Sequence, residues 1–172
     1  MIVHETPRLL LQTWSLDDFD AFAVLARDPE VMRFISSGDT WSDAKIGWFM
    51  GLQSAYHETL GYCLWKLIDR ADGAFIGFCG LAPLSMLDET EIGWWLKPSY
   101  WRKGLASEAA DEVARAAFEH HHLDRIVARA YRANAPSVAI MERLGMTFDR
   151  ALDSGPAGEV VLFKLNAPDR PQ

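Results

Sequence analysis

The segment from residue 91 to residue 109 constrains the fold more than any other part of the chain. It combines a strand-like run, a short basic loop and the start of a helix. The sequence predicts a strand over Glu91–Lys97 that ends at Pro98, because proline has no N–H group for the ladder of a sheet. Gly104 and Ala106 leave little side chain where the chain turns into the helix. The backbone can therefore approach a ligand closely at this turn.

The start of that helix is a candidate anion site. Its first N–H groups have no partner within the helix, and Arg102 and Lys103 add two cations beside the positive end of the helix dipole. Such a helix start is typical of phosphate or pyrophosphate sites. A glycine here can also serve only to turn the chain, so the loop alone leaves both interpretations open. The chain has no G-x-G-x-x-G motif, which argues against a dinucleotide-binding unit, and no G-x-x-x-x-G-K-[ST] motif, which excludes a P-loop at the motif level.

The run Trp101–Ala109, W-R-K-G-L-A-S-E-A, resembles the acetyl-CoA loop of the GNAT N-acetyltransferases. It is most similar to the RimJ/RimL-like branch, which acetylates the N-termini of ribosomal proteins. Three further segments resemble that branch in the same order: Thr6–Leu11, Glu91–Leu96, and Asn134–Ser137 followed by Glu142–Met146. The resemblance covers about residues 6–165.

The resemblance implies a fold as well as an activity. The fold is an α+β, three-layer arrangement in which helices flank a mixed sheet of six or seven strands. The fourth and fifth strands splay apart to admit the pantetheine arm of acetyl-CoA. In this chain those two strands would be Glu91–Lys97 and Arg125–Ala130.

The order of the predicted elements indicates the same class without the resemblance. Helical spacing and cap signals predict helices over Leu16–Arg27, Glu30–Ile35, Ser42 to about Glu58, Lys103–His120 and Asn134–Leu144. Strand-like runs cover Arg8–Thr13, Gly61–Ile68, Ala74–Leu84, Glu91–Lys97, Arg125–Ala130, Thr147–Leu152 and Glu159–Leu165. Early helices, central antiparallel strands and a later strand–helix–strand unit predict a mixed α+β layer fold. Residues 166–172 are expected to form a frayed tail.

Composition narrows the setting. A chain of 172 residues that is 49% hydrophobic predicts one domain over residues 1–172, with its core at about 6–165. The formal net charge of -7 disfavours nucleic-acid binding. The chain has no apolar run near the length of a membrane span and no signal-peptide pattern, so we expect a cytoplasmic protein without a membrane partner.

No metal is expected. Cys63 and Cys79 match no zinc spacing, and we interpret them as buried, reduced thiols. The three consecutive histidines His120–His122 point in different directions at a helix end, which makes a poor metal site. Trp14 and Trp65 are expected in the core, whereas Trp41 and Trp48 could line an acceptor pocket.

The resemblance assigns three groups of residues to acetyl-CoA as co-substrate. They are Trp94, Trp95 and Leu96 in the strand, Arg102, Lys103, Gly104, Leu105, Ala106 and Ser107 in the loop and helix start, and Asn134 and Ser137 later in the chain. Backbone N–H groups of the loop would hold the pyrophosphate, and the backbone of Trp94 and Leu96 would bond the pantetheine. The resemblance also implies a bulge near Gly93 and uses the N–H of Leu96 to polarise the acetyl carbonyl. The glycine supports that bulge loosely.

Glu91 is the candidate general base. Strict alternation puts Glu91 and Trp95 on one face of the strand, and Trp94 and Leu96 on the other. A carboxylate beside tryptophans loses solvation, which raises its pKa toward a useful value for taking a proton from an amine, directly or through water. The alternative is a surface carboxylate at a strand start.

Ser137 is the candidate acid. Asn134, Pro136 and Ser137 suit a helix cap and first turn, and the resemblance implies that the asparagine also contacts the pantetheine while the serine lies near the CoA sulfur. Many GNAT enzymes place a tyrosine four residues after this serine, as the acid for the leaving thiolate. Here that position is Met141, which donates no proton. Ser137, water or no group then protonates the thiolate.

These observations predict an N-acetyltransferase that moves the acetyl group of acetyl-CoA directly to a primary amine in a ternary complex. Neither cysteine lies in a setting that would activate it as a covalent carrier. The acceptor would be a protein or peptide N-terminus or a small-molecule amine. The alternative, supported by Met141, is a CoA-binding sensor or scaffold with weak catalysis. Family members often form homodimers, so the resemblance also suggests a homodimer.

Overall fold

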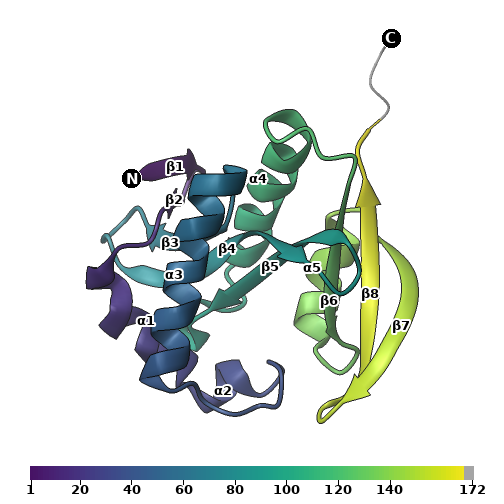
Figure 1. Cartoon of the computed structure of the whole chain (residues 1–172), viewed down its shortest axis with the longest axis horizontal. Helices are drawn as coiled ribbons and strands as arrows, with labels where there is room; N and C mark the ends of the chain where they lie inside the picture. Colours follow the sequence, from purple (N-terminus) through teal and green to yellow (C-terminus); the bar gives the residue numbers. More distant parts are fainter. Residues whose placement is uncertain (169–172) are drawn as a thin grey trace.

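The computed structural model describes residues 1–168, which form an eight-stranded sheet with helices on both faces (Figure 1). The strand order is β1-β2-β3-β4-β5-β6-β8-β7. The strands are β1 (Ile2–Glu5), β2 (Leu9–Gln12), β3 (Leu64–Asp69), β4 (Phe75–Leu84), β5 (Glu89–Leu96), β6 (Arg125–Tyr131), β7 (Thr147–Gly155) and β8 (Gly158–Asn166). The expected mixed α+β class is confirmed. Asn166 of the expected tail belongs to β8, and residues 169–172 of that tail lie outside the described residues.

The expected strand number, six or seven, is wrong because β1 was missed. This strand pairs antiparallel with β2, from Ile2 opposite Gln12 to Glu5 opposite Leu10, with an irregular register between Ile2 and His4. Its four residues are partly or fully exposed and show no apolar alternation. The neighbouring strand, rather than any local pattern, makes this segment a strand.

The helices lie close to their expected positions. They are α1 (Phe19–Ala26), α2 (Pro29–Met32), α3 (Asp43–Leu60), α4 (Leu105–Glu119) and α5 (Ala135–Arg143), with 3-10 turns at Leu16–Asp18 and Pro98–Tyr100. Two expectations differ: the first helix begins with a 3-10 turn, and the second ends at Met32 rather than Ile35. The left-handed glycines Gly61 and Gly145, both at φ 79°, follow α3 and α5 and stop these helices.

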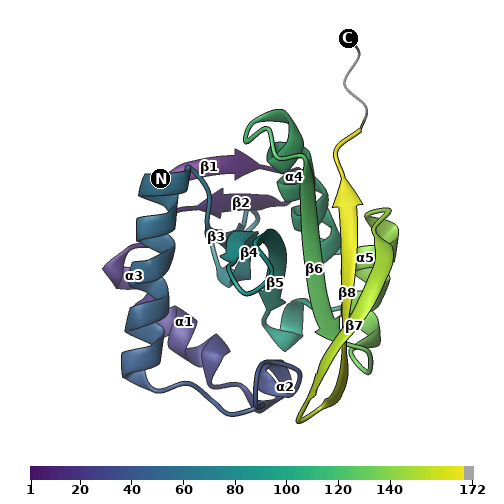
Figure 2. The same cartoon turned by 45° about the vertical axis from the view of Figure 1, so that its right-hand side comes forward.

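The helices cover opposite faces of the sheet (Figures 1 and 2). Helix α4 packs on one face, where its buried alanines permit close approach to Trp65 and Ile92 of the sheet. Helices α1 and α3 pack on the other face through an aromatic cluster that includes Trp14 and Phe78. Trp14 and Trp65 are both buried, as expected. None of the described helices has both the length and the hydropathy that crossing a bilayer requires.

The sheet parts between β5 and β6, the two strands for which a splay was expected. β4 and β5 pair antiparallel along their length, from Gly77 opposite Leu96 to Leu84 opposite Glu89. In contrast, the described part of β5 and β6 pairs in parallel at one position, Glu91 opposite Val127. The expected bulge near Gly93 is not found: the β4–β5 register runs through it unbroken. The gap therefore comes from divergence of β6 and not from an inserted residue in β5.

Candidate active site

A pocket of about 440 Å³ lies along this gap, between the end of β5, the start of α4 and the start of α5. All residues that the sequence assigned to acetyl-CoA line it except Lys103. They are Trp94, Trp95, Leu96, Arg102, Gly104, Leu105, Ala106, Ser107, Asn134 and Ser137. Residues of α2 and the following loop close one side, among them Phe34 and Ile35. We call this cavity the loop pocket.

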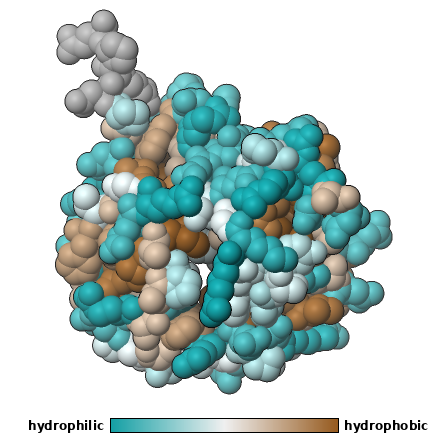
Figure 3. Space-filling model, turned by 180° about the vertical axis from the view of Figure 1, so that it is seen from behind, coloured by the Kyte–Doolittle hydropathy of each residue, from teal (hydrophilic) through white to brown (hydrophobic). Residues whose placement is uncertain are grey.

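A second, smaller pocket of about 220 Å³ opens from the loop pocket on the α1/α3 face. Its walls include Phe49, Phe78 and Trp95, with Glu91 and Arg129 among its charged groups. We call it the aromatic pocket. Figure 3 shows the molecule from behind the view of Figure 1, with a hollow near the centre of that side. The two pockets share six residues: Phe34, Ile35, Trp94, Trp95, Asn134 and Ser137. A molecule in one pocket can therefore meet a molecule in the other beside Ser137.

The loop before α4 has the backbone geometry that an anion site requires. Gly104 is the N-cap of α4 and adopts a left-handed conformation with φ 75°, which glycine tolerates without strain. Arg102 is also left-handed, with φ 59°, an uncommon conformation for a residue with a side chain. The indole N–H of Trp101 donates to the carbonyl oxygen of Leu96 at 2.7 Å and folds the loop back on β5. The ammonium of Lys103 lies over the ring of Tyr100, 5.0 Å from its centroid.

The edge of β5 turns backbone groups toward the gap. The N–H of Lys97 donates to the carbonyl of Ile76 at 2.8 Å, on the β4 side. Because N–H groups alternate along a strand, those of Trp94 and Leu96 point the opposite way, toward β6. They lie beyond the bridge at Glu91, where β6 has diverged. Their N–H groups are available to an extended ligand, which would lie against β5 as an added strand does, whereas the Leu96 carbonyl already accepts from Trp101.

Glu91 lies on the α1/α3 face with Trp95, and Ile92 and Leu96 lie on the α4 face, so the predicted alternation is confirmed. Its carboxylate is mostly buried, with 20% of the side chain exposed, and Oε1 lies 2.9 Å from Nε of Arg129 on β6. Burial raises the pKa of Glu91, and the Arg129 guanidinium opposes this without cancelling it. A raised pKa is the property expected of a general base that works near neutral pH.

Ser137 and Asn134 stand at the start of α5, where the two pockets meet. Among the described residues, the Asn134 side chain makes no cap hydrogen bond, although the backbone carbonyl oxygen of Asn134 accepts from the N–H of Ser137 at 3.1 Å. Its amide is therefore not used for capping and lines both pockets. Met141 is 1% exposed and lines the aromatic pocket, where its thioether donates no proton.

The sequence analysis missed several residues that line the two pockets, among them Arg129, Phe34 and Ile35. Arg129 was recognisable as a cation within an otherwise apolar run of β6, but the run did not indicate its partner. Phe34 and Ile35 follow a short helix and show no local signal of a pocket wall. Neither Trp41 nor Trp48 lines either pocket: Trp41 packs behind the wall residue Trp95, with ring centroids 5.1 Å apart, and Trp48 is 63% exposed.

The two cysteines are free and buried, as expected. Burial raises the pKa of Cys63 to about 12 and raises the pKa of Cys79 further. Both are therefore protonated near neutral pH, and a protonated thiol is a weak nucleophile. Within residues 1–168 there is no cluster of histidine, cysteine, aspartate and glutamate suited to a metal ion.

Comparison with known proteins identifies relatives of this chain. Residues 8–147 match the acetyltransferase (GNAT) domain family. The chain is 31% identical to the FsC-acetyl coenzyme A-N(2)-transacetylase of Aspergillus fumigatus over 78% of its own length and 62% of that relative, so the match spans less than two thirds of that protein. It is also 31% identical to the Bacillus subtilis protein named uncharacterized N-acetyltransferase YnaD, over 82% of this chain and 80% of that one.

Solved structures share the fold. An acetyltransferase from Agrobacterium tumefaciens superposes with a TM-score of 0.81 at 26% identity and covers 95% of this chain and 93% of its own. RimL, the ribosomal L7/L12 alpha-N-protein acetyltransferase in complex with coenzyme A, superposes with a TM-score of 0.81 at 14% identity, over 97% and 98% of the two chains. With the family match over most of its length, the chain is a member of the GNAT family of acetyl-CoA-dependent N-acetyltransferases.

Proposed function

We propose that acetyl-CoA binds in the loop pocket and a primary amine binds in the aromatic pocket, so that the acetyl group passes directly between them. The observation that carries this proposal is the set of six residues common to both pockets, with Ser137 among them. Two substrates held in adjoining cavities react as if at high local concentration, because binding has already removed their freedom of motion. The buried, protonated cysteines favour direct transfer over an acetyl-enzyme.

The loop pocket fits the groups of acetyl-CoA. The start of α4 offers backbone N–H groups and the positive end of a helix dipole to a pyrophosphate. Gly104 and Ala106 keep this backbone open to close approach. The edge of β5 at Trp94 and Leu96 offers amide partners to the pantetheine. The N–H of Leu96 is our candidate to polarise the acetyl carbonyl as charge develops on its oxygen.

The transfer requires one base and one acid. Glu91 takes a proton from the acceptor ammonium, directly or through water, and the freed lone pair attacks the acetyl carbonyl carbon. A C–N bond forms and the C–S bond breaks. The nitrogen loses its second proton to water, and the CoA thiolate gains one either from water or from the Ser137 hydroxyl, which water then reprotonates. Met141 donates no proton to the thiolate. Because a thiolate is a weak base and a good leaving group, it needs less help from an acid than the acceptor amine needs from the base Glu91.

The aromatic pocket favours a particular acceptor. A volume of about 220 Å³ admits a small group, and the walls of Phe49, Phe78 and Trp95 favour an apolar or aromatic body. Such an acceptor is either the first residue of a peptide with an apolar side chain or a small amine such as phenylethylamine.

The test is steady release of CoASH with acetyl-CoA and a panel of amines, followed with a thiol reagent, together with mass spectrometry of the protein. Release that depends on the amine, with no acetylated protein, supports direct transfer. An acetyl adduct on the protein during turnover would refute it. The alternative, a CoA-binding sensor favoured by Met141, predicts binding of acetyl-CoA without release for every amine.

A further inference from the structure

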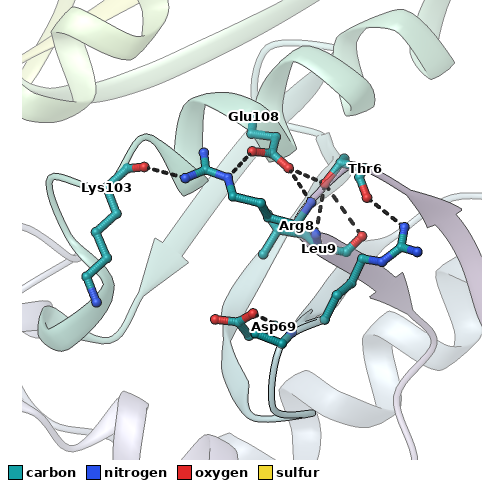
Figure 4. A network of polar contacts seen from close by, with 8 residues as sticks. Thr6, Arg8, Leu9, Asp69, Lys103 and Glu108 are labelled. Carbon is teal, nitrogen blue, oxygen red and sulfur yellow. Dashed lines mark hydrogen bonds and ion pairs between the residues drawn. The ribbon is translucent and has the colours of Figure 1, made fainter.

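A polar network joins the N-terminal hairpin to the loop before α4 (Figure 4). The carboxylate of Glu108, in the first turn of α4, accepts hydrogen bonds from the Thr6 hydroxyl at 2.5 Å and the Arg8 backbone N–H at 2.9 Å. Its second oxygen accepts from Nε of Arg8 at 2.6 Å. The two residues stand 100 positions apart in the chain. Strand β2 is thereby attached to the start of α4.

Arg8 also reaches the loop itself. Its Nη1 donates to the carbonyl oxygen of Lys103 at 2.9 Å, while the ammonium of Lys103 points elsewhere, toward Tyr100 (Figure 4). In a trans peptide the C=O and the N–H point in opposite directions. The N–H of Gly104 belongs to the same peptide, so it points away from Arg8. Gly104 lines the loop pocket, where we place the pyrophosphate.

The loop requires such an external contact. Arg102 and Gly104 are both left-handed, on either side of Lys103, and the Gly104 N-cap has no side chain with which to fix the first turn. The guanidinium of Arg8 holds two acceptors at once, the Glu108 carboxylate and the Lys103 carbonyl. It also neutralises a carboxylate that would otherwise repel a phosphate from the start of α4.

We propose that Arg8 is a positioning residue for the pyrophosphate of acetyl-CoA: it orients the Lys103–Gly104 peptide so that the Gly104 N–H faces the ligand. This role rests on the proposed function of the loop pocket. Arg8 acts through the loop and not as a phosphate ligand, because its charge is paired with Glu108. Thr6 and Glu108 hold Arg8 in place.

The variant Arg8→Lys tests the geometry at constant charge. A lysine ammonium lacks the planar fork that bridges the Glu108 carboxylate and the Lys103 carbonyl. The matched control is Arg115→Lys. Arg115 lies on α4, the helix that carries Glu108, and pairs there with Glu112 and Glu119. The Arg115 side chain is 45% exposed, against 50% for Arg8. Glu108→Gln is a second variant, which keeps an acceptor for Thr6 but removes the charge that holds Arg8.

Two ligands separate a positioning role from a general structural one. CoASH carries the pyrophosphate, and S-acetylpantetheine is an acetyl donor that lacks it. We expect Arg8→Lys to weaken CoASH binding in calorimetry and to raise the KM for acetyl-CoA, each about tenfold, the effect of losing one charge-assisted hydrogen bond. We expect kcat/KM for S-acetylpantetheine to stay within twofold, Glu108→Gln to act in the same direction, and Arg115→Lys to match the parent.

Equal losses with both donors would overturn the proposal, since a disordered site weakens both. Unchanged CoASH binding in folded Arg8→Lys and Glu108→Gln would also overturn it. Failure of the parent protein to bind CoASH is a different result: it would refute the proposed function of the loop pocket and the role of Arg8 with it. Thermal unfolding of each variant shows that the comparison is made on folded protein.

Discussion

Arg129 of β6 pairs with Glu91 of β5, Nε to Oε1 at 2.9 Å, at the point where the two strands part. The candidate base is thus held by a cation from the far side of the gap that receives the substrates. Burial raises the pKa of this carboxyl group, and Arg129 limits the rise. The proton affinity of Glu91 therefore depends on how closely the two halves of the sheet approach each other.

The first prediction concerns pH. Arg129→Gln removes a cation that favours the carboxylate, so the pKa of Glu91 rises and the base is free only at higher pH. We expect the acid limb of the kcat/KM profile to move to higher pH, by about one unit. Arg125→Gln is the control, because Arg125 forms an equivalent pair with Glu89 between the same strands but outside both pockets. Equal shifts in both variants would contradict a special role for Arg129.

The second prediction concerns Glu91 itself. Glu91→Gln keeps the shape of the side chain but cannot accept the proton, so kcat should fall by about a hundredfold and the acid limb should vanish. Binding of acetyl-CoA, measured by calorimetry, should not change, because Glu91 lines the aromatic pocket and not the loop pocket. Near-normal kcat with the pH profile of the parent would remove Glu91 from the mechanism.

The third prediction separates the two substrates. Ala82 lines the aromatic pocket and lies opposite Glu91 in the β4–β5 ladder. Ala82→Leu should partly fill a cavity of about 220 Å³ and raise the KM for the amine, while the affinity for acetyl-CoA stays the same. Ala55→Leu, on the exposed side of α3, adds the same methyl groups without touching either pocket. If Ala82→Leu weakened acetyl-CoA instead, the assignment of the pockets would be reversed.

The fourth prediction concerns stability in acid. Burial lowers the pKa of His4 and the pKa of His121. The nearby carboxylate of Glu112 raises the pKa of His4 but does not cancel the effect of burial. The neighbouring charges of Arg115 and the other histidines act in the same direction as burial. As the pH falls below 6.5, His4 and His121 therefore bind protons in the unfolded chain. In the folded protein the same two side chains bind protons only at a lower pH.

Stability should therefore be full at pH 8 and fall as the pH drops through 6.5 toward the lowered values. The melting temperature is the measurement. His4→Gln, which does not titrate, should flatten this dependence, and comparison with the parent at pH 8 removes any difference that is unrelated to protonation. A melting temperature independent of pH between 8 and 5 would contradict the account.

Local pattern predicted much of the site. Alternation in Glu91–Lys97, the proline after it and the glycine at the helix start describe a strand, a loop and a helix that neighbour one another in the chain. The family resemblance, and not a local pattern, predicted the splay between β5 and β6. The structure differs from the prediction where the conformation of a segment depends on a distant partner. Strand β1 exists because β2 pairs with it.

The same reason explains the missed side chains. The proposed role of Arg129 depends on its pairing with Glu91, 38 positions away. That of Arg8 depends on its pairing with Glu108, 100 positions away. A single sequence shows the residue types but not which of them meet. The expected bulge near Gly93 failed for another reason: glycine permits a bulge but does not require one, and the adjoining β4 strand stays in register.

Calorimetric titration of acetyl-CoA into the protein tests whether the loop before α4 binds the pyrophosphate. Gly104→Glu places an acid at the start of α4, and Gly73→Glu is the matched control, since Gly73 has nearly the same φ, 74°, and lines neither pocket. Both variants carry the same backbone strain, about 1 kcal/mol. We expect micromolar binding by the parent and by Gly73→Glu, and loss of binding in Gly104→Glu. Equal binding by all three proteins would show that the pyrophosphate does not bind at this loop.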